Sequence, residues 1–354
     1  MSQLSIGIVG LPNVGKSTLF NALLGKQVAD ASNYPFCTID PNIGIVEVPD
    51  KKLAVLSKIS QSQKIIPAVV EFVDIAGLVK GAAQGEGLGN QFLTNIRQCQ
   101  AICHVVRHFS DPQVARLGST NPKSDFELIC AELIIKDLES IDRYIESNLK
   151  CPTDPPRLAL AKKLKAEMEK GTLASAVTLS NAEKILLKQF FLLTNKPFFI
   201  AINVDEDTYK KTEKSNIKVG DRDTLFICAK TESELNQFSL AEKQAYLKEF
   251  GLRQSGLERL ISQAYQTLKL QSFYTTGPKE TRAWTIPQTT TAPQAAGVIH
   301  SDLQRGFITA ETISFEDFVH CQGWQSAKQA GKLRQEGKDY IMQPDDIVEF
   351  RFNV

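Results

Sequence analysis

The segment from Gly10 to Ser17 combines residue types that bind phosphate. It reads Gly-Leu-Pro-Asn-Val-Gly-Lys-Ser and matches the spacing G-x-x-x-x-G-K-[ST] of a phosphate-binding loop. Glycines allow backbone N–H groups to close around phosphate oxygens, Lys16 can reach the β- and γ-phosphates, and the Ser17 hydroxyl can ligate Mg²⁺. The pattern predicts a site for a nucleoside triphosphate, with a coincidental glycine turn as the alternative.

The residues around this segment predict the elements that such a loop requires. The run from Leu4 to Val9 is short, apolar and β-branched, which indicates a buried strand. After the loop, apolar residues recur at helical spacing, at Leu19, Phe20, Leu23 and Leu24. A strand, a loop and a helix in this order would place the positive end of the helix at the phosphates.

A second segment, from Val28 to Asn42, suits a loop that closes over a bound nucleotide. It is polar, contains prolines and has one threonine, Thr38. A hydroxyl and an N–H group at Thr38 could meet Mg²⁺ and the γ-phosphate, as in a switch I segment. An ordinary threonine in a surface loop is the alternative interpretation.

A third segment follows the apolar run from Val69 to Val73. Asp74 and Gly77 form a D-x-x-G pattern, so we expect Asp74 in the Mg²⁺ shell and the Gly77 N–H at the γ-phosphate. Leu78 follows, where Ras-like proteins have the glutamine that orients the attacking water. Because leucine cannot hydrogen-bond water, hydrolysis should be slow or should use another group.

The base specificity is predicted by Asn203-Val204-Asp205-Glu206, which follows the apolar run from Pro197 to Ile202. A GTPase would have N-K-x-D here, whereas this chain has Val204 for the lysine and Glu206 for the aspartate. Loss of that aspartate leaves guanine donors unpaired, at about 1 to 3 kcal/mol each. We therefore expect a preference for ATP over GTP, with Val204 as an apolar wall for the base. Ala229 lies where GTPases have a second base-contacting loop.

Composition and charge narrow the class of protein. The 354 residues are 42% hydrophobic and 23% charged, and 41 Lys and Arg balance 40 Asp and Glu, so no overall positive field attracts nucleic acid. Seven cysteines form no metal-ligand spacing and are odd in number, which indicates free thiols in a reducing compartment. The sequence shows no secretory leader and no apolar run of about 18 residues, so we expect a cytoplasmic protein without membrane contact. We also expect a monomer.

The periodicity of apolar residues predicts three parts. Only helical signals occur from Phe126 to Leu193, with a last run from Ile185 to Leu193, so residues 125–196 should form a helical hairpin. This hairpin would be inserted into an α/β domain made of residues 1–124 and 197–276. Residues 277–354 should form a small α+β domain. Three lysines of the hairpin are either a solvated face or an RNA contact: Lys162, Lys163 and Lys165.

The order of these motifs resembles the YchF/Obg-like ATPase family along essentially the whole chain. Besides the phosphate-binding loop, the resemblance rests on four runs: Phe72 to Gly81, Gly85 to Leu93, Asn203 to Glu206, and Arg282 to Pro287. It implies a P-loop G domain with a mostly parallel sheet and helices on both faces, a helical insertion and a C-terminal ubiquitin-like TGS domain. It also implies Mg²⁺-dependent ATP hydrolysis at the β-γ bond and nucleotide-dependent association with the ribosome and its rRNA, in the regulation of translation or a stress response.

The resemblance also implies roles for single residues. Lys16 would be catalytic, and the Asn203 to Glu206 segment would hold the adenine, chiefly at Val204. Ser17 and Thr38 would hold the metal. The phosphates would be bound by Asn13, Val14, Gly15, Lys16, Ser17 and Thr18. Related enzymes with an asparagine such as Asn13 can also bind K⁺, which helps to neutralise developing charge.

The chain departs from this family in one loop. Bacterial members have a histidine after the segment His104-Val105-Val106-Arg107, proposed to replace the missing glutamine, and Ala115 stands in its place here. His108 lies in the same segment and is a candidate catalytic group, although a structural histidine is the competing interpretation. Two other functions stay open: an Obg-like GTPase acting as a ribosome-associated factor, and a nucleotide-gated binding protein with negligible hydrolysis.

Overall fold

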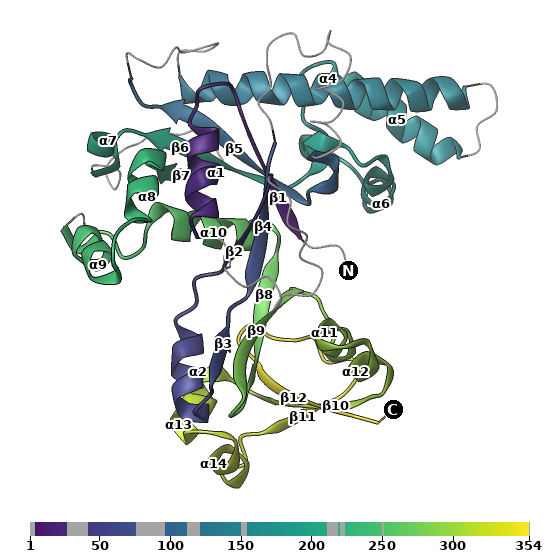
Figure 1. Cartoon of the computed structure of the whole chain (residues 1–354). Helices are drawn as coiled ribbons and strands as arrows, with labels where there is room; N and C mark the ends of the chain where they lie inside the picture. The colour runs from purple at the N-terminus through teal and green to yellow at the C-terminus, as the bar shows by residue number, and fades with distance from the viewer. Residues whose placement is uncertain are drawn as a thin grey trace. The chain divides into compact units, whose positions relative to one another are not determined.

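The computed structural model describes residues 4–26, 42–75, 96–111, 121–149, 154–210, 219, 224–249 and 251–353, and Figure 1 shows the elements that they form. The contacts within the chain separate two compact units. The first comprises Met1–Lys26, Ile39–Gly44 and Glu71–Leu260. The second comprises Gln27–Thr38, Ile45–Val70 and Ile261–Val354. The chain therefore contributes to the second unit both early and late in the sequence.

The first sheet has, among the described residues, the strand order β2-β4-β1-β5-β6-β7. The neighbours from β4 to β7 in this order pair in parallel. Their sequences are short, apolar and largely buried, because helices cover both faces of such a sheet (Figure 1). The bounds are β1 (Ser5–Gly10), β2 (Ile43–Glu47), β4 (Val69–Asp74), β5 (Ala101–His108), β6 (Phe198–Val204) and β7 (Thr224–Ile227).

The helices of the first unit include the one predicted after the phosphate-binding loop. Leu19, Phe20 and Leu23 are buried on this helix, as their spacing predicted. The bounds are α1 (Lys16–Leu24), α4 (Pro122–Asn148), α7 (Glu206–Lys210), α8 (Ala229–Leu235) and α9 (Leu240–Glu249). α10 (Gly256–Thr267) begins in the first unit and ends in the second.

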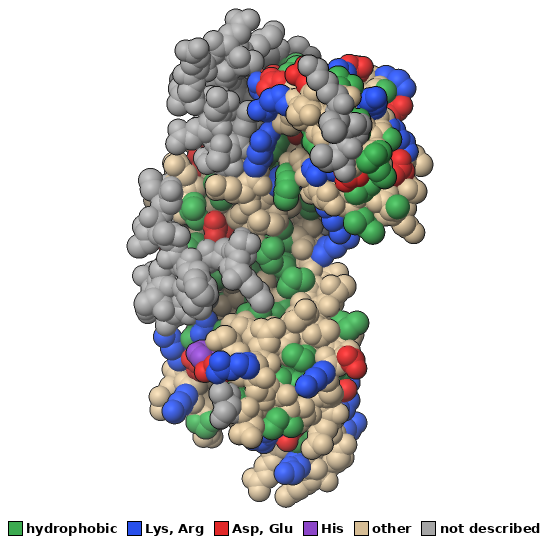
Figure 2. All heavy atoms as spheres, turned by 90° about the vertical axis from the view of Figure 1, so that its right-hand side faces the viewer, with side chains coloured by type: hydrophobic (Ala, Val, Ile, Leu, Met, Phe, Trp, Pro, Cys, Tyr) green, Lys and Arg blue, Asp and Glu red, His purple; other side chains and the backbone are tan. Residues whose placement is uncertain are grey.

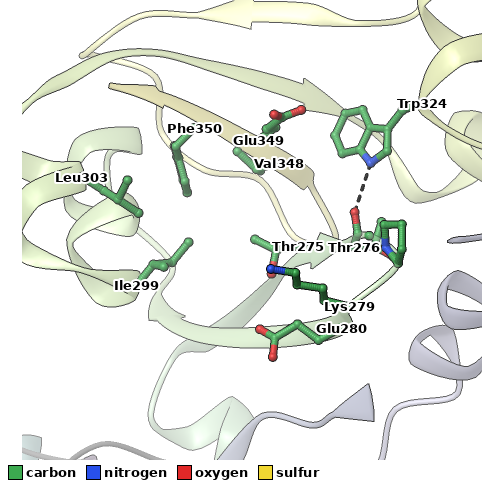
Figure 3. A pocket seen from close by; sticks show the side chains of 12 residues that line it. Thr275, Thr276, Lys279, Glu280, Ile299, Leu303, Trp324, Val348, Glu349 and Phe350 are labelled. Carbon is green, nitrogen blue, oxygen red and sulfur yellow. Dashed lines mark hydrogen bonds between the residues drawn. The ribbon is translucent and has the colours of Figure 1, made fainter. Parts of the chain in front are cut away.

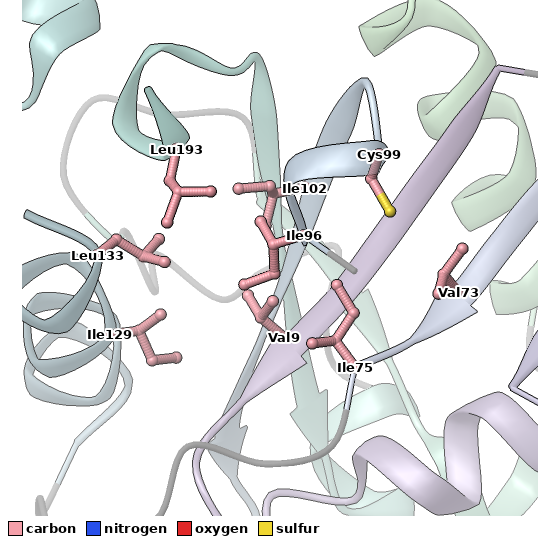
Figure 4. Close-up of a cluster of buried hydrophobic side chains, with 9 residues drawn as sticks. All are labelled: Val9, Val73, Ile75, Ile96, Cys99, Ile102, Ile129, Leu133 and Leu193. Carbon is pink, nitrogen blue, oxygen red and sulfur yellow. The ribbon is translucent and has the colours of Figure 1, made fainter. Parts of the chain in front are cut away.

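The register of β5 and β6 decides which side chains share a face of the sheet. Arg107 pairs with Asn203, and His108 pairs with Val204. Because successive strand residues point to opposite faces, the first pair points to one face and the second pair to the other. The second face is the one that α4 covers, and a buried cluster of apolar side chains from α4 and the strands fills the space between them (Figure 4).

Between β5 and β6 the chain forms the expected helical insertion. α4 and α5 (Pro155–Met168) pack side by side (Figure 1). Both begin with a cap that the sequence specifies, because Asn121 accepts a hydrogen bond from the Ser124 N–H, Asp154 does so from the Arg157 N–H, and a proline follows each cap. The apolar stripes of the two helices meet in a buried cluster.

The last helical run of the insertion is shorter than predicted. α6 (Asn181–Leu187) ends at Leu187, and single turns follow at η4 (Lys188–Phe190) and η5 (Leu193–Asn195), after η3 (Ala174–Ala176) earlier in the chain. Phe191, directly after η4, adopts a left-handed φ of 51°, which ends that turn. The carboxylate of Asp137 on α4 then accepts hydrogen bonds from the Leu193 and Thr194 N–H groups, both at 2.8 Å. The prediction from Ile185 to Leu193 was therefore wrong in extent.

The second unit is a mixed sheet with the order β11-β10-β12-β8-β9-β3 among the described residues. β8 and β9 form an antiparallel hairpin, whereas β12 pairs with β8 and β3 with β9 in parallel. The strands are β3 (Lys64–Ile66), β8 (Leu270–Thr276), β9 (Glu280–Pro287), β10 (Phe307–Ile313), β11 (Arg334–Glu336) and β12 (Ile347–Phe352). The helices are α2 (Lys52–Ser60), α11 (Ala292–Ile299), α12 (Ser301–Arg305), α13 (Phe315–Cys321) and α14 (Trp324–Gln329).

The two units do not follow the predicted domain boundaries. β8 was expected in the first domain, but its strand partners lie in the second sheet. α2 also belongs to the second unit, where Leu53 and Leu56 pack in a cluster with Tyr274 and Ile313. Because these partners are about 200 residues apart in the chain, local sequence patterns carry no sign of the pairing.

His104 is a buried histidine in the middle of β5. It is 1% exposed, and its Nδ1 has no hydrogen-bond partner. Its ring packs edge-on against the rings of Phe126 and Phe198, with 5.1 Å between ring centroids in both cases. Burial lowers the pKa of His104 to about 3, so the ring is neutral and serves packing.

This burial predicts a loss of stability in mild acid. Below about pH 6.5 the unfolded chain binds a proton at His104 that the folded chain does not bind until about pH 3. The free energy of unfolding should therefore fall by about 2 kcal/mol from this residue between pH 7 and pH 5. Denaturant unfolding should show a weaker pH dependence for His104→Leu than for the unaltered chain. An unchanged pH dependence in His104→Leu would contradict this explanation.

Candidate nucleotide-binding site

The phosphate-binding loop joins the end of β1 to the start of α1. Its backbone passes through two left-handed residues, Asn13 with φ 63° and Gly15 with φ 90°. α1 has no side-chain cap and no acidic residue in its first turn, so the positive end of the helix suits an anion. A side chain at Gly15 would have to displace Asn203, because a Cβ there would lie 2.1 Å from Nδ2 of Asn203.

Asn203 links this loop to the first residue of α8. Its Nδ2 donates to the carbonyl of Val14 at 2.9 Å, and its Oδ1 accepts from the Ala229 N–H at 3.0 Å. Asn203 is buried, so both hydrogen bonds are shielded from water. One side chain therefore brings together the two segments predicted to contact the phosphates and the base.

Lys16 and Asp74, predicted to serve the phosphates and the metal, meet in the structure. Nζ of Lys16 forms an ion pair with Oδ1 of Asp74, and Lys16 is buried. Ser17 and Thr18 are exposed at the start of α1. The carbonyl of Asn42, the last residue of the segment that contains Thr38, accepts a hydrogen bond from the Asp74 N–H at 2.8 Å. Three predicted segments thus converge at the ends of β1 and β4.

The oxygens at this point fit Mg²⁺. In nucleotide sites Mg²⁺ takes one or two protein oxygens and fills its remaining positions with phosphate oxygens and water. The hydroxyl of Ser17 and the carboxylate of Asp74 are ligands of this kind. The described part of the chain contains no cluster of three or more His, Cys, Asp or Glu residues that could hold a metal by itself. The donor set therefore suits a metal that arrives with a nucleotide.

The side chain of Val204 does not form the predicted apolar wall. It is 2% exposed and packs in a cluster with Ile202 and Tyr209, on the face of the sheet opposite Asn203. Glu206 is exposed as the first residue of α7.

Four residues that matter to the prediction lie outside the described residues. They are Thr38, Gly77, Leu78 and Ala115. Their assigned roles stay predictions from the sequence.

His108 points away from the phosphate-binding loop. It shares a face of the sheet with Val204, whereas Arg107 and Asn203, on the other face, reach the loop carbonyls. Its electrostatic neighbour is Asp205. Burial opposes ionisation of Asp205, but hydrogen bonds from Thr208, one from its N–H at 2.7 Å, and the charge of His108 keep the pKa of Asp205 below its ordinary value.

Arg107 is a site residue that the motifs did not identify. It is buried, its Nη1 donates to the carbonyl of Asn13 at 3.4 Å, and its Cζ lies 4.2 Å from the centroid of the Phe109 ring. The signal in the sequence is a basic residue directly after the apolar run from Ala101 to Val106. Such a residue needs hydrogen-bond partners, but the sequence does not show which carbonyls provide them.

Two of the three lysines predicted as a solvated face or an RNA contact, Lys163 and Lys165 but not Lys162, form ion pairs in the described part of the chain. Nζ of Lys163 lies 2.9 Å from a carboxylate oxygen of Glu183, and Nζ of Lys165 lies 2.6 Å from one of Asp142. Figure 2 shows basic and acidic side chains interspersed on this face of the molecule rather than gathered by sign. This arrangement is typical of a solvated surface and does not favour the RNA contact.

A groove of about 560 Å³ is lined by residues of the second unit alone (Figure 3). Ile299, Leu303 and Phe350 provide apolar lining, and Nε1 of Trp324 donates to the carbonyl of Thr276 at 3.2 Å. The lining contains no histidine or cysteine. The groove therefore lacks the features of the phosphate site.

Among the described helices, none has the length and apolar character needed to span a bilayer.

Comparison with known proteins finds relatives along the whole chain. Residues 5–145 match a family model described as "50S ribosome-binding GTPase", and residues 270–353 match the model YchF-GTPase_C, described as a "Protein of unknown function". A protein of Bacillus subtilis (strain 168) named "Ribosome-binding ATPase YchF" is 45% identical over 99% of this chain and 100% of its own length. The protein of that name from Escherichia coli O157:H7 is 46% identical over 98% of this chain and 99% of its own length.

A solved structure agrees with these relatives. It is described as "Structure of the Schizosaccharomyces pombe YchF GTPase" and matches with a TM-score of 0.87 and 32% identity, over 99% of this chain and 98% of that chain. The names of the bacterial relatives specify an ATPase, whereas this description specifies a GTPase. Base preference is therefore a question for this chain's own residues.

The contact at Gly15 predicts the effect of a single methyl group. Gly15→Ala should weaken binding of a nucleoside triphosphate by about tenfold or more, because the Cβ must displace Asn203 and break its hydrogen bond to Val14. Gly171→Ala is the matched control, since Gly171 has a similar φ of 86° but no heavy atom within 4 Å of the added Cβ. It should lose about 1 kcal/mol of stability and no affinity. Titration calorimetry with Mg²⁺ present measures the affinity of each variant for the nucleotide, and equal affinities of the two variants would contradict the prediction.

Proposed function

Because the chain belongs to the YchF family, we propose that it is an ATPase that hydrolyses the β-γ bond of ATP and associates with the ribosome in a nucleotide-dependent way. The observation that carries the proposal is the pair of hydrogen bonds from Asn203 to Val14 and Ala229, which we call the Asn203 bridge. Through it, a complete phosphate-binding loop is joined to the segment from Asn203 to Glu206, which lacks the guanine-binding aspartate. The names of the bacterial relatives support both the ATPase activity and the ribosomal partner. A ribosomal partner would place the protein in the cytoplasm.

The phosphates would be held by the loop and by charge. The N–H groups of residues 13 to 18 would bind phosphate oxygens, and Lys16 would neutralise the β- and γ-phosphates. Ser17 and Asp74, with Thr38 and the N–H of Gly77, would complete the site around Mg²⁺, which when bound neutralises charge that develops on the phosphates. K⁺ beside Asn13 would add to that neutralisation.

The preference for ATP would come from the segment that Asn203 begins. Glu206 is one methylene longer than the aspartate of GTPases and lies exposed at the start of α7, so it need not pair with guanine N1–H and N2–H₂. An exposed carboxylate at this place also need not face N1 of adenine, which is an acceptor. The segment from Asn203 to Glu206 would contact the base.

Hydrolysis should be slow in the isolated protein. Leu78 has no group that can orient water, and His108 faces the opposite side of the sheet from the residues that contact the loop. These two observations also favour the second candidate function, a nucleotide-gated binding protein with negligible hydrolysis. The two functions differ in whether ribosomes stimulate the release of phosphate.

The base segment predicts how specificity can be shifted. In competition against a fluorescent ATP analogue, ATP should displace the probe at lower concentration than GTP. Glu206→Asp should raise the affinity for GTP relative to ATP by about tenfold, because it restores the acceptor that guanine requires. The control Glu234→Asp changes an exposed glutamate on α8 and should leave the ratio unchanged. Tighter binding of GTP than of ATP by the unaltered chain would identify a GTPase instead.

The orientation of His108 predicts a second result, in single-turnover phosphate release with and without ribosomes. His108→Ala should release phosphate within about twofold of the unaltered chain, because its side chain does not face the loop. Lys16→Ala should abolish binding and release, since it removes the charge that holds the phosphates. A large fall for His108→Ala would make His108 a catalytic base. No release in either condition by the unaltered chain would establish the binding protein.

A further inference from the structure

The carbonyl groups of the phosphate-binding loop are bound from outside by two side chains. Loop N–H groups can converge on a phosphate only if the neighbouring carbonyls point away from it. The carbonyl of Val14 is held by Nδ2 of Asn203 at 2.9 Å, and the carbonyl of Asn13 is held by Nη1 of Arg107 at 3.4 Å. Two consecutive peptide groups are therefore held with their carbonyls outward.

Asn13 has a left-handed backbone conformation. Its φ is 63°, which asparagine adopts more readily than most residues with a Cβ but which still differs from the favoured right-handed region. Asn13 precedes α1, which begins at Lys16, so no helical hydrogen bonds fix this conformation. A hydrogen bond to the Asn13 carbonyl from outside stabilises this conformation.

Arg107 is placed to supply this hydrogen bond rigidly. Its own N–H donates to Oδ2 of the buried Asp125 at 3.2 Å, which fixes the backbone at the end of β5. Its Nε and Nη2 donate to the carbonyls of Phe109 at 3.2 Å and Asp111 at 3.5 Å. One guanidinium thus binds three carbonyls from two segments of the chain.

The ring of Phe109 completes the contact. The guanidinium stacks on this ring at 4.2 Å, and Cε1 of the ring lies 3.9 Å from the position of a Cβ at Gly15. The ring therefore covers the outer side of the loop while Arg107 covers the ring. A lysine could not replace this arrangement, because its ammonium group is a compact donor without the planar fork.

We propose that Arg107 is a positioning residue for the phosphate-binding loop: it holds the Asn13 carbonyl outward so that the loop N–H groups face the phosphates. The role belongs to the recognition of the phosphates and not of the base. This inference rests on the proposed function in one respect, namely that the ligand is a nucleoside di- or triphosphate.

The test measures affinities of the full chain for ATP, ADP and adenosine with Mg²⁺ present. Arg107→Met removes the donors of the side chain but keeps an unbranched apolar chain. It should lower the affinity for ATP and ADP by about tenfold or more and leave the affinity for adenosine unchanged. Arg107→Lys keeps the charge and should still bind ATP several-fold more weakly than the unaltered chain. The control is Arg143→Met, which removes an exposed arginine that donates to the Glu139 carbonyl within α4, and it should behave as the unaltered chain.

Each other outcome counts against the inference or against the proposed function. If Arg107→Met binds ATP as tightly as Arg143→Met does, Arg107 does not position the loop. The same holds if Arg107→Met loses equal affinity for ATP and for adenosine. If Arg107→Met fails to fold, Arg107→Lys decides, and unaltered affinity in that variant overturns the inference. If the unaltered chain binds GTP but not ATP, the proposed function fails, and the same comparison with GTP and guanosine still tests Arg107.

Discussion

The amide of Asn203 binds the Val14 carbonyl through its nitrogen and the Ala229 N–H through its oxygen, and both hydrogen bonds are buried. An asparagine suits this position because one short side chain offers a donor and an acceptor in fixed geometry. The approach is possible only because Gly15 has no side chain, since a Cβ would lie 2.1 Å from the amide nitrogen. The shape of the phosphate loop and the position of the base segment are therefore not independent. A change at either end of this bridge would alter how both halves of a nucleotide are held.

The parallel sheet turns this local contact into a site. The carboxyl ends of parallel strands lie at one edge of a sheet, so the residues after β1, β4 and β6 come together there although they are far apart in the chain. The alternation of side chains then separates neighbours that look equivalent in the sequence. Arg107 and Asn203 face the loop, whereas His108 and Val204 face α4 and the apolar core. Function at this edge thus depends on which face of the sheet each side chain points to as much as on the chemistry of that side chain.

The helical insertion is attached to the sheet through two buried carboxylates on α4. Asp125 accepts the N–H of Arg107 at the end of β5, and Asp137 accepts the N–H groups of Leu193 and Thr194 just before β6. Burial raises the pKa of Asp137, although these hydrogen bonds act in the opposite direction. The segments on either side of the insertion are thus each hydrogen-bonded to α4, one at Asp125 in its first turn and the other at Asp137 near its middle. Because Arg107 also contacts the phosphate loop, the first turn of α4 and the candidate site share one residue.

Much of this protein is determined by local sequence. The phosphate loop, the strands beside it and the caps of α4 and α5 follow from residue types at fixed spacing, because short-range sterics and hydrogen bonds decide them. Other features required the tertiary structure. The assignment of α2 and β3 to the second unit depends on partners about 200 residues away, and the core position of Val204 depends on strand parity. The contact of Arg107 with Asn13 joins positions 94 residues apart. A sequence motif shows which chemical groups are present. The pairing of distant strands and helices decides which face each group points to and which carbonyls it meets, because the burial of apolar surface between these elements provides most of the folding free energy.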